Sequence, residues 1–185
     1  MRFAIGLLVG LILAPILLAV AGSLGLLSVS ATAAPPAWES RTAGRAVRAS
    51  IAREAVGLAS PVPANEENLR IGLRVYRMNC SGCHGDLGSP SPWGTTGFYP
   101  RVPQFAERPS LLTTPEMFLV VKHGIRYSGM GAWSWMLSDE DIWRAVSFVS
   151  HVRNLPPSVK EIWMRKPPAV KEIWMRKRPA AAAGS

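Results

Sequence analysis

The chain opens with a long run of apolar side chains. Residues 4–29 include no charged side chain, and Arg2 is the only charge that precedes them. A helix of these 26 residues would be about 39 Å long, enough to cross a hydrocarbon core of roughly 30 Å. The pattern predicts a transmembrane or signal helix within residues 1–34. Because the next charge is that of Glu39, the N-terminus is expected in the cytoplasm and the rest of the chain outside it.

Two fates of this helix are open. The triplets Ala19-Val20-Ala21 and Ala31-Thr32-Ala33 both resemble the small-residue sites at which signal peptides are cleaved. Cleavable apolar cores usually run to about 7 to 15 residues, and this run is much longer. The length therefore favours an anchor that stays in the membrane.

Residues 35–63 form a second patterned segment. Basic and apolar side chains alternate here at spacings that are typical of an amphipathic helix. Two roles are open for it: it lies on anionic lipid headgroups, or it is a solvated linker with a few residues against the next domain. The run Ser60-Pro61-Val62-Pro63 ends the pattern and marks the domain boundary. The basic set is Arg41, Arg45, Arg48 and Arg53, and the apolar set is Val47, Ile51, Ala55 and Leu58.

Between residues 64 and 157 the pattern predicts three helices and no strand. Apolar side chains at i, i+3, i+4 and i+7 after Asn65 predict the first helix, over residues 66–78. The second is expected over residues 114–123, with Thr114 as its N-cap, and the third over residues 138–154. The fold class is therefore all-α, with the first and last of these helices packed through their apolar stripes.

The last segment, residues 158–185, is basic and overlaps a direct repeat. Residues 156–166 and 167–177 differ at one position, where Ser158 is replaced by Ala169. Ser158 and an acid three residues later can form a capping box, which the second copy cannot form. We expect the first copy to dock on the domain, and the second copy to remain undocked or to contact a partner. The docking side chains would be Val159, Ile162 and Trp163.

The distribution of charge excludes one class of function. The chain carries 21 Lys and Arg against 12 Asp and Glu, a formal net charge of +9. Residues 64–158 hold nine basic and eight acidic side chains, whereas residues 159–185 hold seven and two. Because the basic excess lies mainly outside the domain, binding of nucleic acid is not expected.

Both cysteines lie in one motif, Cys80-Ser81-Gly82-Cys83-His84. C-x-x-C-H is the attachment signature of c-type haem. Two thiols one helical turn apart can reach the two vinyl groups of one haem, and the adjacent imidazole then lies under the iron. A redox dithiol would need a βαβ surrounding, and a zinc site would need two more ligands close by. Cys80, Cys83 and His84 are therefore expected to bind one covalent haem c.

Met130 is the candidate for the sixth ligand of the iron. It lies between Gly129 and Gly131 in a predicted loop, where the backbone can come close and the thioether can reach the metal. His123 is the rival, although a histidine at a helix end more often caps carbonyl groups. His151 is expected to be structural. A His/Met pair raises the reduction potential and fills the coordination sphere, which suits outer-sphere electron transfer.

With these residues identified, about half of the chain, from Asn65 to Leu155, resembles the small single-haem class I c-type cytochromes. Gly72 and Tyr76 match the glycine and the aromatic residue of that family's first helix. Phe148 lies where the family has the partner aromatic of the last helix. The resemblance implies that these two helices cross closely, so that only a small residue fits between them.

The resemblance also suggests how the proximal histidine is oriented. The family uses a proline carbonyl in the first loop, and such a bond fixes the imidazole tautomer. Here the irregular connection 85–109 offers three candidates, with a preference for the third: Pro92, Pro100 and Pro103. Gly131 departs from the family, in which many members have proline after the ligand methionine, and this glycine implies a softer distal loop.

Four further side chains have two possible roles each. Trp133 and Trp135 would wall the haem crevice or pack in the core. Arg101 and Arg126 would pair with haem propionates or remain solvated. Neither alternative is excluded by the sequence.

Together these features predict a single-haem c-type cytochrome that transfers one electron at a time between a donor and an acceptor protein. It would not be an enzyme, and it would be free or a subunit of a redox complex. Thioether attachment takes place outside the cytoplasm in bacteria, which agrees with a haem domain in the periplasm tethered to the inner membrane. The alternative is a haem enzyme or a gas or peroxide sensor with a labile distal ligand.

Overall fold

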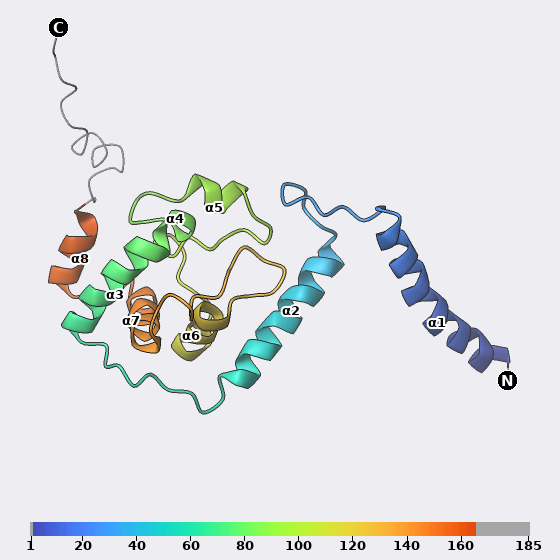
Figure 1. Cartoon of the computed structure of the whole chain (residues 1–185), viewed down its shortest axis with the longest axis horizontal. Helices are drawn as coiled ribbons and strands as arrows, with labels where there is room; N and C mark the ends of the chain where they lie inside the picture. Colours follow the sequence, from blue (N-terminus) through green and yellow to red (C-terminus); the bar gives the residue numbers. More distant parts are fainter. Residues whose placement is uncertain (1, 166–185) are drawn as a thin grey trace, which may run out of the picture.

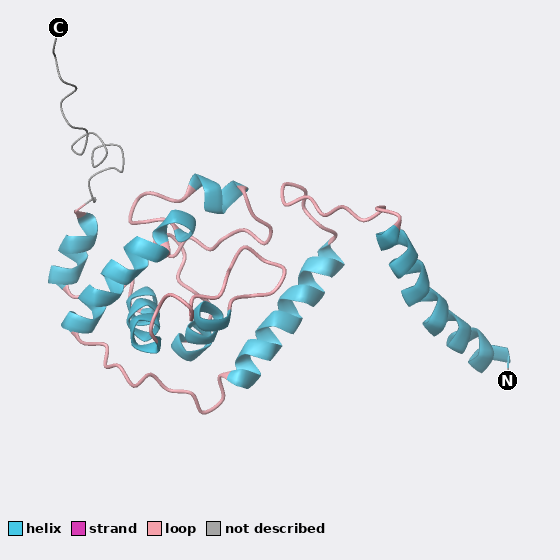
Figure 2. Ribbon diagram, viewed as in Figure 1, coloured by secondary structure: helices cyan, strands magenta, loops and turns pink. Residues whose placement is uncertain are grey.

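The computed structural model describes residues 2–165, and within that range the chain folds into helices and loops without a strand (Figure 1, Figure 2). The all-α prediction is confirmed. The second copy of the repeat, residues 167–177, lies outside the described range. The helices are α1 (Arg2–Ser23), α2 (Ala37–Glu54), α3 (Glu66–Asn79), α4 (Ser81–His84), α5 (Pro92–Thr96), α6 (Thr114–His123), α7 (Asp139–Ser150) and α8 (Pro157–Met164).

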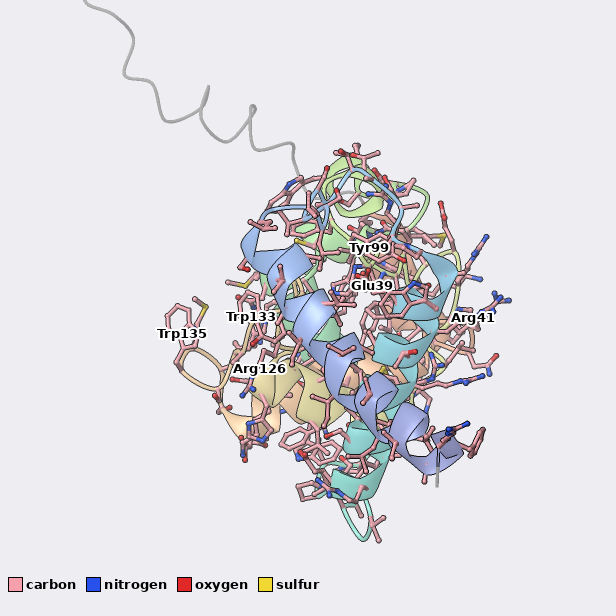
Figure 3. The ribbon with its side chains drawn as sticks, turned by 90° about the vertical axis from the view of Figure 1, so that its right-hand side faces the viewer. Glu39, Arg41, Tyr99, Arg126, Trp133 and Trp135 are labelled. Atoms are coloured by element: carbon pink, nitrogen blue, oxygen red, sulfur yellow. The ribbon has the colours of Figure 1, made fainter. Side chains whose placement is uncertain are left out.

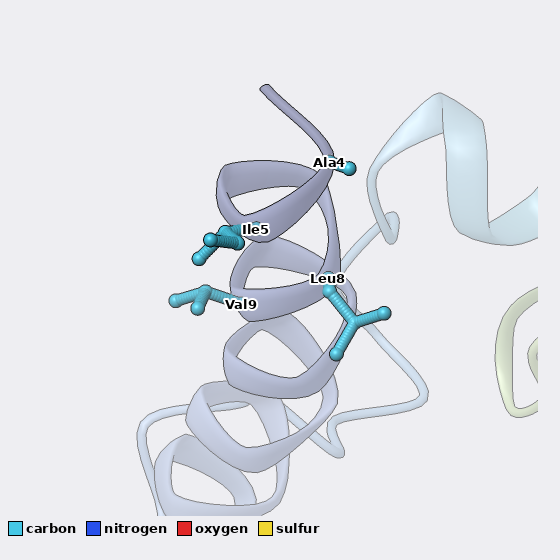
Figure 4. A pocket seen from close by; sticks show the side chains of 4 residues that line it. All are labelled: Ala4, Ile5, Leu8 and Val9. Carbon is cyan, nitrogen blue, oxygen red and sulfur yellow. The ribbon is translucent and has the colours of Figure 1, made fainter. Parts of the chain in front are cut away.

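The first helix, α1, projects away from the other helices (Figure 1). None of its residues is buried, and its first turns carry a shallow hollow lined only by Ala4, Ile5, Leu8 and Val9 (Figure 4). Its 22 residues span about 33 Å, which is enough for a hydrocarbon core. Apolar surface of this extent is stable only when lipid or protein covers it. The helix therefore has the length and composition of a membrane anchor or a signal helix.

At the centre of the domain, α3 and α7 cross closely, and a glycine makes this possible. A Cβ atom at Gly72 would lie 2.1 Å from the carbonyl oxygen of Arg144 and 3.1 Å from Cβ of Phe148. One turn further along α3, the rings of Tyr76 and Phe148 meet with their centroids 5.4 Å apart. The crossing expected from the resemblance is therefore confirmed. Other buried members of this core are Leu69, Leu73, Met117, Phe118, Ile142, Trp143, Val146 and Val149.

Side-chain caps determine where the helices of the domain begin. Asn65 accepts the backbone N–H of Asn68 at the start of α3, and Ser138 accepts that of Asp141 at the start of α7. In the sequence, Asn65 precedes the apolar pattern of the first helix, and Ser138 with the acids that follow it resembles a capping box. A side-chain oxygen that binds a free first-turn amide stabilises a helix by about 1 kcal/mol. These caps therefore fix the start of the two helices that form the central crossing.

The N-cap of α6 and the end of α7 differ from the prediction. The N-cap of α6 is Thr113 rather than Thr114, because Glu116 completes a capping box with it. That reciprocal pair requires the acid to be the third helical residue, and only Thr113 stands three positions before it. Helix α7 ends at Ser150, four residues earlier than predicted, where the N–H of His151 turns back to carbonyl groups of the preceding turn.

The basic helix α2 packs against α6 along one side. Its half-buried residues recur every three or four positions, whereas its four arginines are exposed. This side of α2 agrees with the second expected role, a linker helix with a few residues packed against the next domain. The arginines remain open to solvent. The half-buried positions are Ser40, Gly44, Val47 and Ile51.

The first copy of the repeat forms α8, which docks on α3. Val159 is fully buried and Trp163 is 3% exposed, whereas Ile162 is 38% exposed. The ring of Trp163 meets that of Phe148 edge to face, with centroids 5.3 Å apart. Two of the three expected docking side chains therefore anchor the helix, and the third lies at its edge.

The capping box predicted for the first copy is wrong. Helix α8 begins at Pro157, and Pro156 occupies the N-cap position without a side-chain acceptor. Ser158 therefore lies inside the first turn, and its hydroxyl donates to the carboxylate of Glu66 at 2.6 Å. The serine that distinguishes the two copies consequently binds α3 instead of its own helix.

Gly72→Ala is expected to destabilise the folded protein by about 1–3 kcal/mol, because the added methyl group collides with the carbonyl group of Arg144. Thermal unfolding followed by circular dichroism measures the effect as a lower Tm. Gly44→Ala on α2 is the matched control, since its Cβ would meet only a side-chain atom at 3.8 Å. An unchanged Tm for Gly72→Ala would contradict the close crossing.

Candidate haem site

The C-x-x-C-H motif lies at the C-terminal end of α3, where the chain turns into the single-turn helix α4. The N–H groups of Cys83 and His84 donate to the carbonyl oxygen of Cys80, at 3.1 and 2.9 Å. The two thiols are free, half-buried and one helical turn apart. Burial raises the pKa of the Cys80 thiol to about 12. The local backbone therefore has the helical geometry that the spacing of the motif predicts.

Three side chains from outside α4 hold the backbone carbonyl groups of this segment. The Ser91 hydroxyl donates to Gly82 at 2.6 Å, and the phenol of Tyr76 donates to Gly85 at 2.6 Å. The Gln104 amide donates to Cys83 at 3.0 Å. Burial raises the pKa of Tyr76, so its phenol stays protonated as a donor. The motif is thereby tied to α3 and to the loop that follows it.

Gln104 was not expected at the site. Its side chain is buried, and Oε1 accepts the N–H of Ser91 at 2.8 Å while Nε2 donates to Cys83 and Val102. A glutamine in a loop rich in Pro carries no sequence signal for such a role. Removing it would leave several buried backbone groups without a partner.

The connection 85–109 is also more regular than the sequence pattern indicates, because it contains the short helix α5. Ser91 caps this helix by accepting the N–H of Gly94, and Pro92 is its first residue. The serine followed by proline is a start signal that could have revealed it. A Cβ atom at Gly94 would lie 1.9 Å from the carbonyl oxygen of Cys83, so α5 packs directly on the motif.

The imidazole of His84 is held by the third candidate proline. Its Nδ1 lies 2.9 Å from the carbonyl oxygen of Pro103. Because a carbonyl group only accepts, Nδ1 carries the proton and Nε2 keeps its lone pair. The ring stacks on Phe105 with centroids 4.6 Å apart and an interplanar angle of 9°. Burial lowers the pKa of His84, which favours the neutral ring, and the bond to Pro103 partly opposes this shift.

This donor set fits a c-type haem. Two free thiols one turn apart provide the attachment points, and the neutral imidazole offers Nε2 as an iron ligand. Cys80, Cys83 and His84 would hold the group. A structural zinc site would need a group of such ligands close together. Within residues 2–165, no three His, Cys, Asp or Glu side chains are arranged to hold a metal ion.

Met130 lies in a loop that closes on itself. Its carbonyl oxygen accepts the N–H of Ile125 at 2.9 Å, and its own N–H donates to Ser128 Oγ at 3.1 Å. Gly124 has φ +71°, and a Cβ atom there would lie 2.8 Å from the carbonyl oxygen of Met130. Two backbone constraints therefore set the position of Met130, whose side chain is half-buried.

Two glycines flank Met130 in different surroundings. A Cβ atom at Gly129 would lie 2.3 Å from the ring of Phe98, so this loop lies directly against the one that carries Pro103. A Cβ atom at Gly131 would meet nothing within 4 Å. Gly131, which stands where many members of the family have proline, is therefore not required by close packing.

The other two histidines are placed differently. His123, the rival ligand, is exposed at the last position of α6. His151 Nδ1 lies 2.8 Å from the carbonyl oxygen of Ser147, which agrees with a structural role at the end of α7. His123 is therefore exposed, whereas His151 is half-buried but hydrogen-bonded to the end of its own helix.

The side chains for which the sequence leaves two roles open differ in their exposure and hydrogen bonds: Trp133, Trp135, Arg101 and Arg126. Trp135 projects outward and is 77% exposed, with its indole N–H donating to Ala132 (Figure 3). Trp133 is half-buried on the same loop. The Arg101 guanidinium donates to the carbonyl groups of Thr96 and Phe98, at 2.6 and 2.8 Å, whereas Arg126 is exposed. Of the four, Arg101 and Trp135 thus donate to backbone carbonyl groups close to them in the chain.

A second cluster next to the motif joins it to α8. Asp86, two residues after His84, forms an ion pair with Arg77 at 3.0 Å and accepts the indole N–H of Trp163. Arg77 also donates to the carbonyl groups of Ile162 and Trp163 in the last turn of α8. The guanidinium thereby provides donors for carbonyl groups at the C-terminal end of α8. The sequence pattern did not indicate this cluster.

Tyr76→Phe is expected to destabilise the domain by about 1–2 kcal/mol, because the carbonyl group of Gly85 loses its buried donor while the ring packing remains. Chemical denaturation followed by circular dichroism measures the loss. Tyr127→Phe is the matched control, since Tyr127 is 96% exposed, and its unfolding curve should coincide with that of the parent. Coincident curves for both variants would show that the phenol does not hold the motif.

Comparison with known protein families gives a match to most of this domain. The family model described as cytochrome c oxidase, cbb3-type, subunit III matches residues 67–149. No curated protein and no solved structure matches the chain. The matched residues run from the first turn of α3 almost to the end of α7, and they include the C-x-x-C-H motif and the Met130 loop. The chain therefore carries a c-type cytochrome domain, the kind of domain that transfers electrons through covalently bound haem c.

Proposed function

We propose that this protein is a single-haem electron carrier whose haem domain, residues 64–157, faces the periplasm from the bacterial inner membrane. The observation that supports this best is the geometry of His84. Its Nδ1 proton is directed to the carbonyl group of Pro103, and Nε2 is left as a ligand one residue beyond two free thiols. In this proposal Cys80 and Cys83 form thioether bonds to one haem.

The side chains that would bind the haem iron in this proposal are those of His84 and Met130. When bound, haem c supplies an iron that gains or loses one electron. A thioether and an imidazole together would favour the reduced state of that iron and would leave no position for a substrate. Met130 suits this role because its backbone is held on both sides, through Ile125 and Ser128. His123 is exposed at a helix end and lacks such support.

The chain also limits the movement of the proximal ligand. The carbonyl groups on both sides of His84 have donors from Gln104 and Tyr76, and the imidazole is stacked on Phe105. A ligand held in this way keeps its position when the charge on the metal changes. Small structural change between oxidation states favours fast electron transfer, which is the property that a carrier needs.

Redox partners follow from this role. The domain would accept an electron from a donor protein and pass it to an acceptor protein. The name of the matching family model refers to a subunit of a cytochrome c oxidase, which makes a respiratory oxidase the favoured acceptor class. In that case the chain is either a tethered carrier or a subunit of the complex, and the basic tail, residues 158–185, would contribute to docking.

Met130→Leu is expected to abolish the weak far-red charge-transfer band of the oxidised protein and to lower its reduction potential, because leucine has no sulfur ligand for iron. The visible spectrum and a potentiometric titration measure both effects. The reduced variant should also bind carbon monoxide rapidly, whereas the parent protein should not.

Met136→Leu is the control for this prediction. Met136 is 51% exposed and lies six residues beyond the proposed ligand, so its loss should leave the band, the potential and the carbon monoxide response unchanged. A parent protein that lacks the band at neutral pH and binds carbon monoxide rapidly would contradict the proposed carrier and indicate an open iron site.

Whether α1 stays on the protein as a membrane anchor is tested by determining the first residue of the protein in purified membranes. We expect α1 to be retained, because its apolar run is longer than that of a cleavable signal. N-terminal sequencing should begin at or next to Met1. A mature start at Gly22 or Ala34 would show that the segment is a signal peptide.

A further inference from the structure

Helix α2 carries a stripe of four side chains that the haem site does not use. Trp38, Arg41, Arg45 and Arg48 recur at i, i+3, i+7 and i+10, which places them on one face of the helix. All four are exposed, Trp38 by 62%. Every ion pair found among residues 2–165 is formed by other side chains, so none of these three arginines is paired with a carboxylate there.

The neighbouring side of α2 is fixed to the haem domain. Ser40, Gly44, Val47 and Ile51 are half-buried, and α2 contacts α6. The two sets of positions are about 100° apart around the helix, at 100° per residue. The helix therefore holds the domain on one side and presents the Trp and Arg stripe on another. Figure 3 shows Arg41 extending outward from α2.

The distance along the chain places this stripe close to the membrane. The apolar run ends at Val29, and Trp38 follows nine residues later. Nine extended residues span at most about 32 Å, so α2 begins within that distance of the membrane surface if α1 crosses the bilayer. Tryptophan is enriched at the level of lipid headgroups, and guanidinium groups are suited to lipid phosphates.

We propose that the stripe formed by Trp38, Arg41, Arg45 and Arg48 binds the headgroups of anionic phospholipids. The guanidinium groups would bind lipid phosphates, for which their planar donors are suited, and the indole would lie at the interface. Because α2 also packs on α6, this contact sets the orientation of the haem domain relative to the bilayer. The inference rests on the proposed retention of α1.

The test uses the full-length holoprotein in nanodiscs, with one spin label on α2. Since haem attachment occupies Cys80 and Cys83, an introduced cysteine is the only free thiol. Ala52→Cys carries the label on the stripe, and Ala43→Cys carries it on the opposite face; both positions are exposed. Collision with a water-soluble relaxation agent is measured in nanodiscs of phosphatidylcholine alone and of phosphatidylcholine with phosphatidylglycerol.

We expect the label at Ala52 to be shielded relative to Ala43 in the anionic nanodiscs, and the difference to be lost at high salt. The triple variant R41Q, R45Q and R48Q should also lose this difference in accessibility between the two labels. The charge-matched triple variant R74Q, R108Q and R153Q, at exposed positions elsewhere, should retain it.

Equal accessibility at both positions in anionic nanodiscs would overturn the proposal, as would shielding that survives the first triple variant. The intact mass of each sample separates this failure from failure of the anchor. A processed mass shows that α1 is absent, whereas equal accessibility at full mass shows that the stripe does not bind lipid.

Discussion

The position of one imidazole depends on how the backbone around it is held. His84 lies at the end of a four-residue helix, which is too short to be stable alone. Hydrogen bonds from Tyr76, Ser91 and Gln104 to three carbonyl groups of the segment replace the support that a longer helix would give. The Pro103 carbonyl group then fixes the ring. The residues that hold His84 are positioned by the rest of the fold. The close crossing of α3 and α7 places Tyr76, and the connection 85–109 with its short helix α5 places Ser91, Pro103 and Gln104.

The two sides of the proposed haem are supported in different ways. The proximal side is held by buried side chains from α3 and from the connection 85–109, whereas the distal loop is held mainly by its own backbone and by the contact of Gly129 with Phe98. Beyond the matched residues 67–149, α8 adds a further tie through Asp86, next to the proximal segment. Helix α8 therefore adds to the side that already has the larger number of side-chain hydrogen bonds.

Much of this structure could be predicted from the sequence because the signals are local. The caps at Asn65 and Ser138, the apolar stripes and the C-x-x-C-H spacing each act within a few residues, and the structure follows them. Gln104 and the cluster of Arg77, Asp86 and Trp163 could not be predicted, because their partners are brought together only by the fold. The resemblance to a family helped where local signals fail: it reduced the partner of His84 to three prolines, of which Pro103 is the one in contact. Ligation by Met130 stays a prediction.

The central claim is that one haem is bound covalently through Cys80 and Cys83. Its most direct test is the pyridine haemochrome spectrum of the purified protein after extraction with acidified acetone, in a strain with a working maturation system. We predict that the polypeptide keeps its colour after extraction and gives a c-type spectrum with one haem per chain. A colourless polypeptide, with all haem in the acetone, would contradict the account.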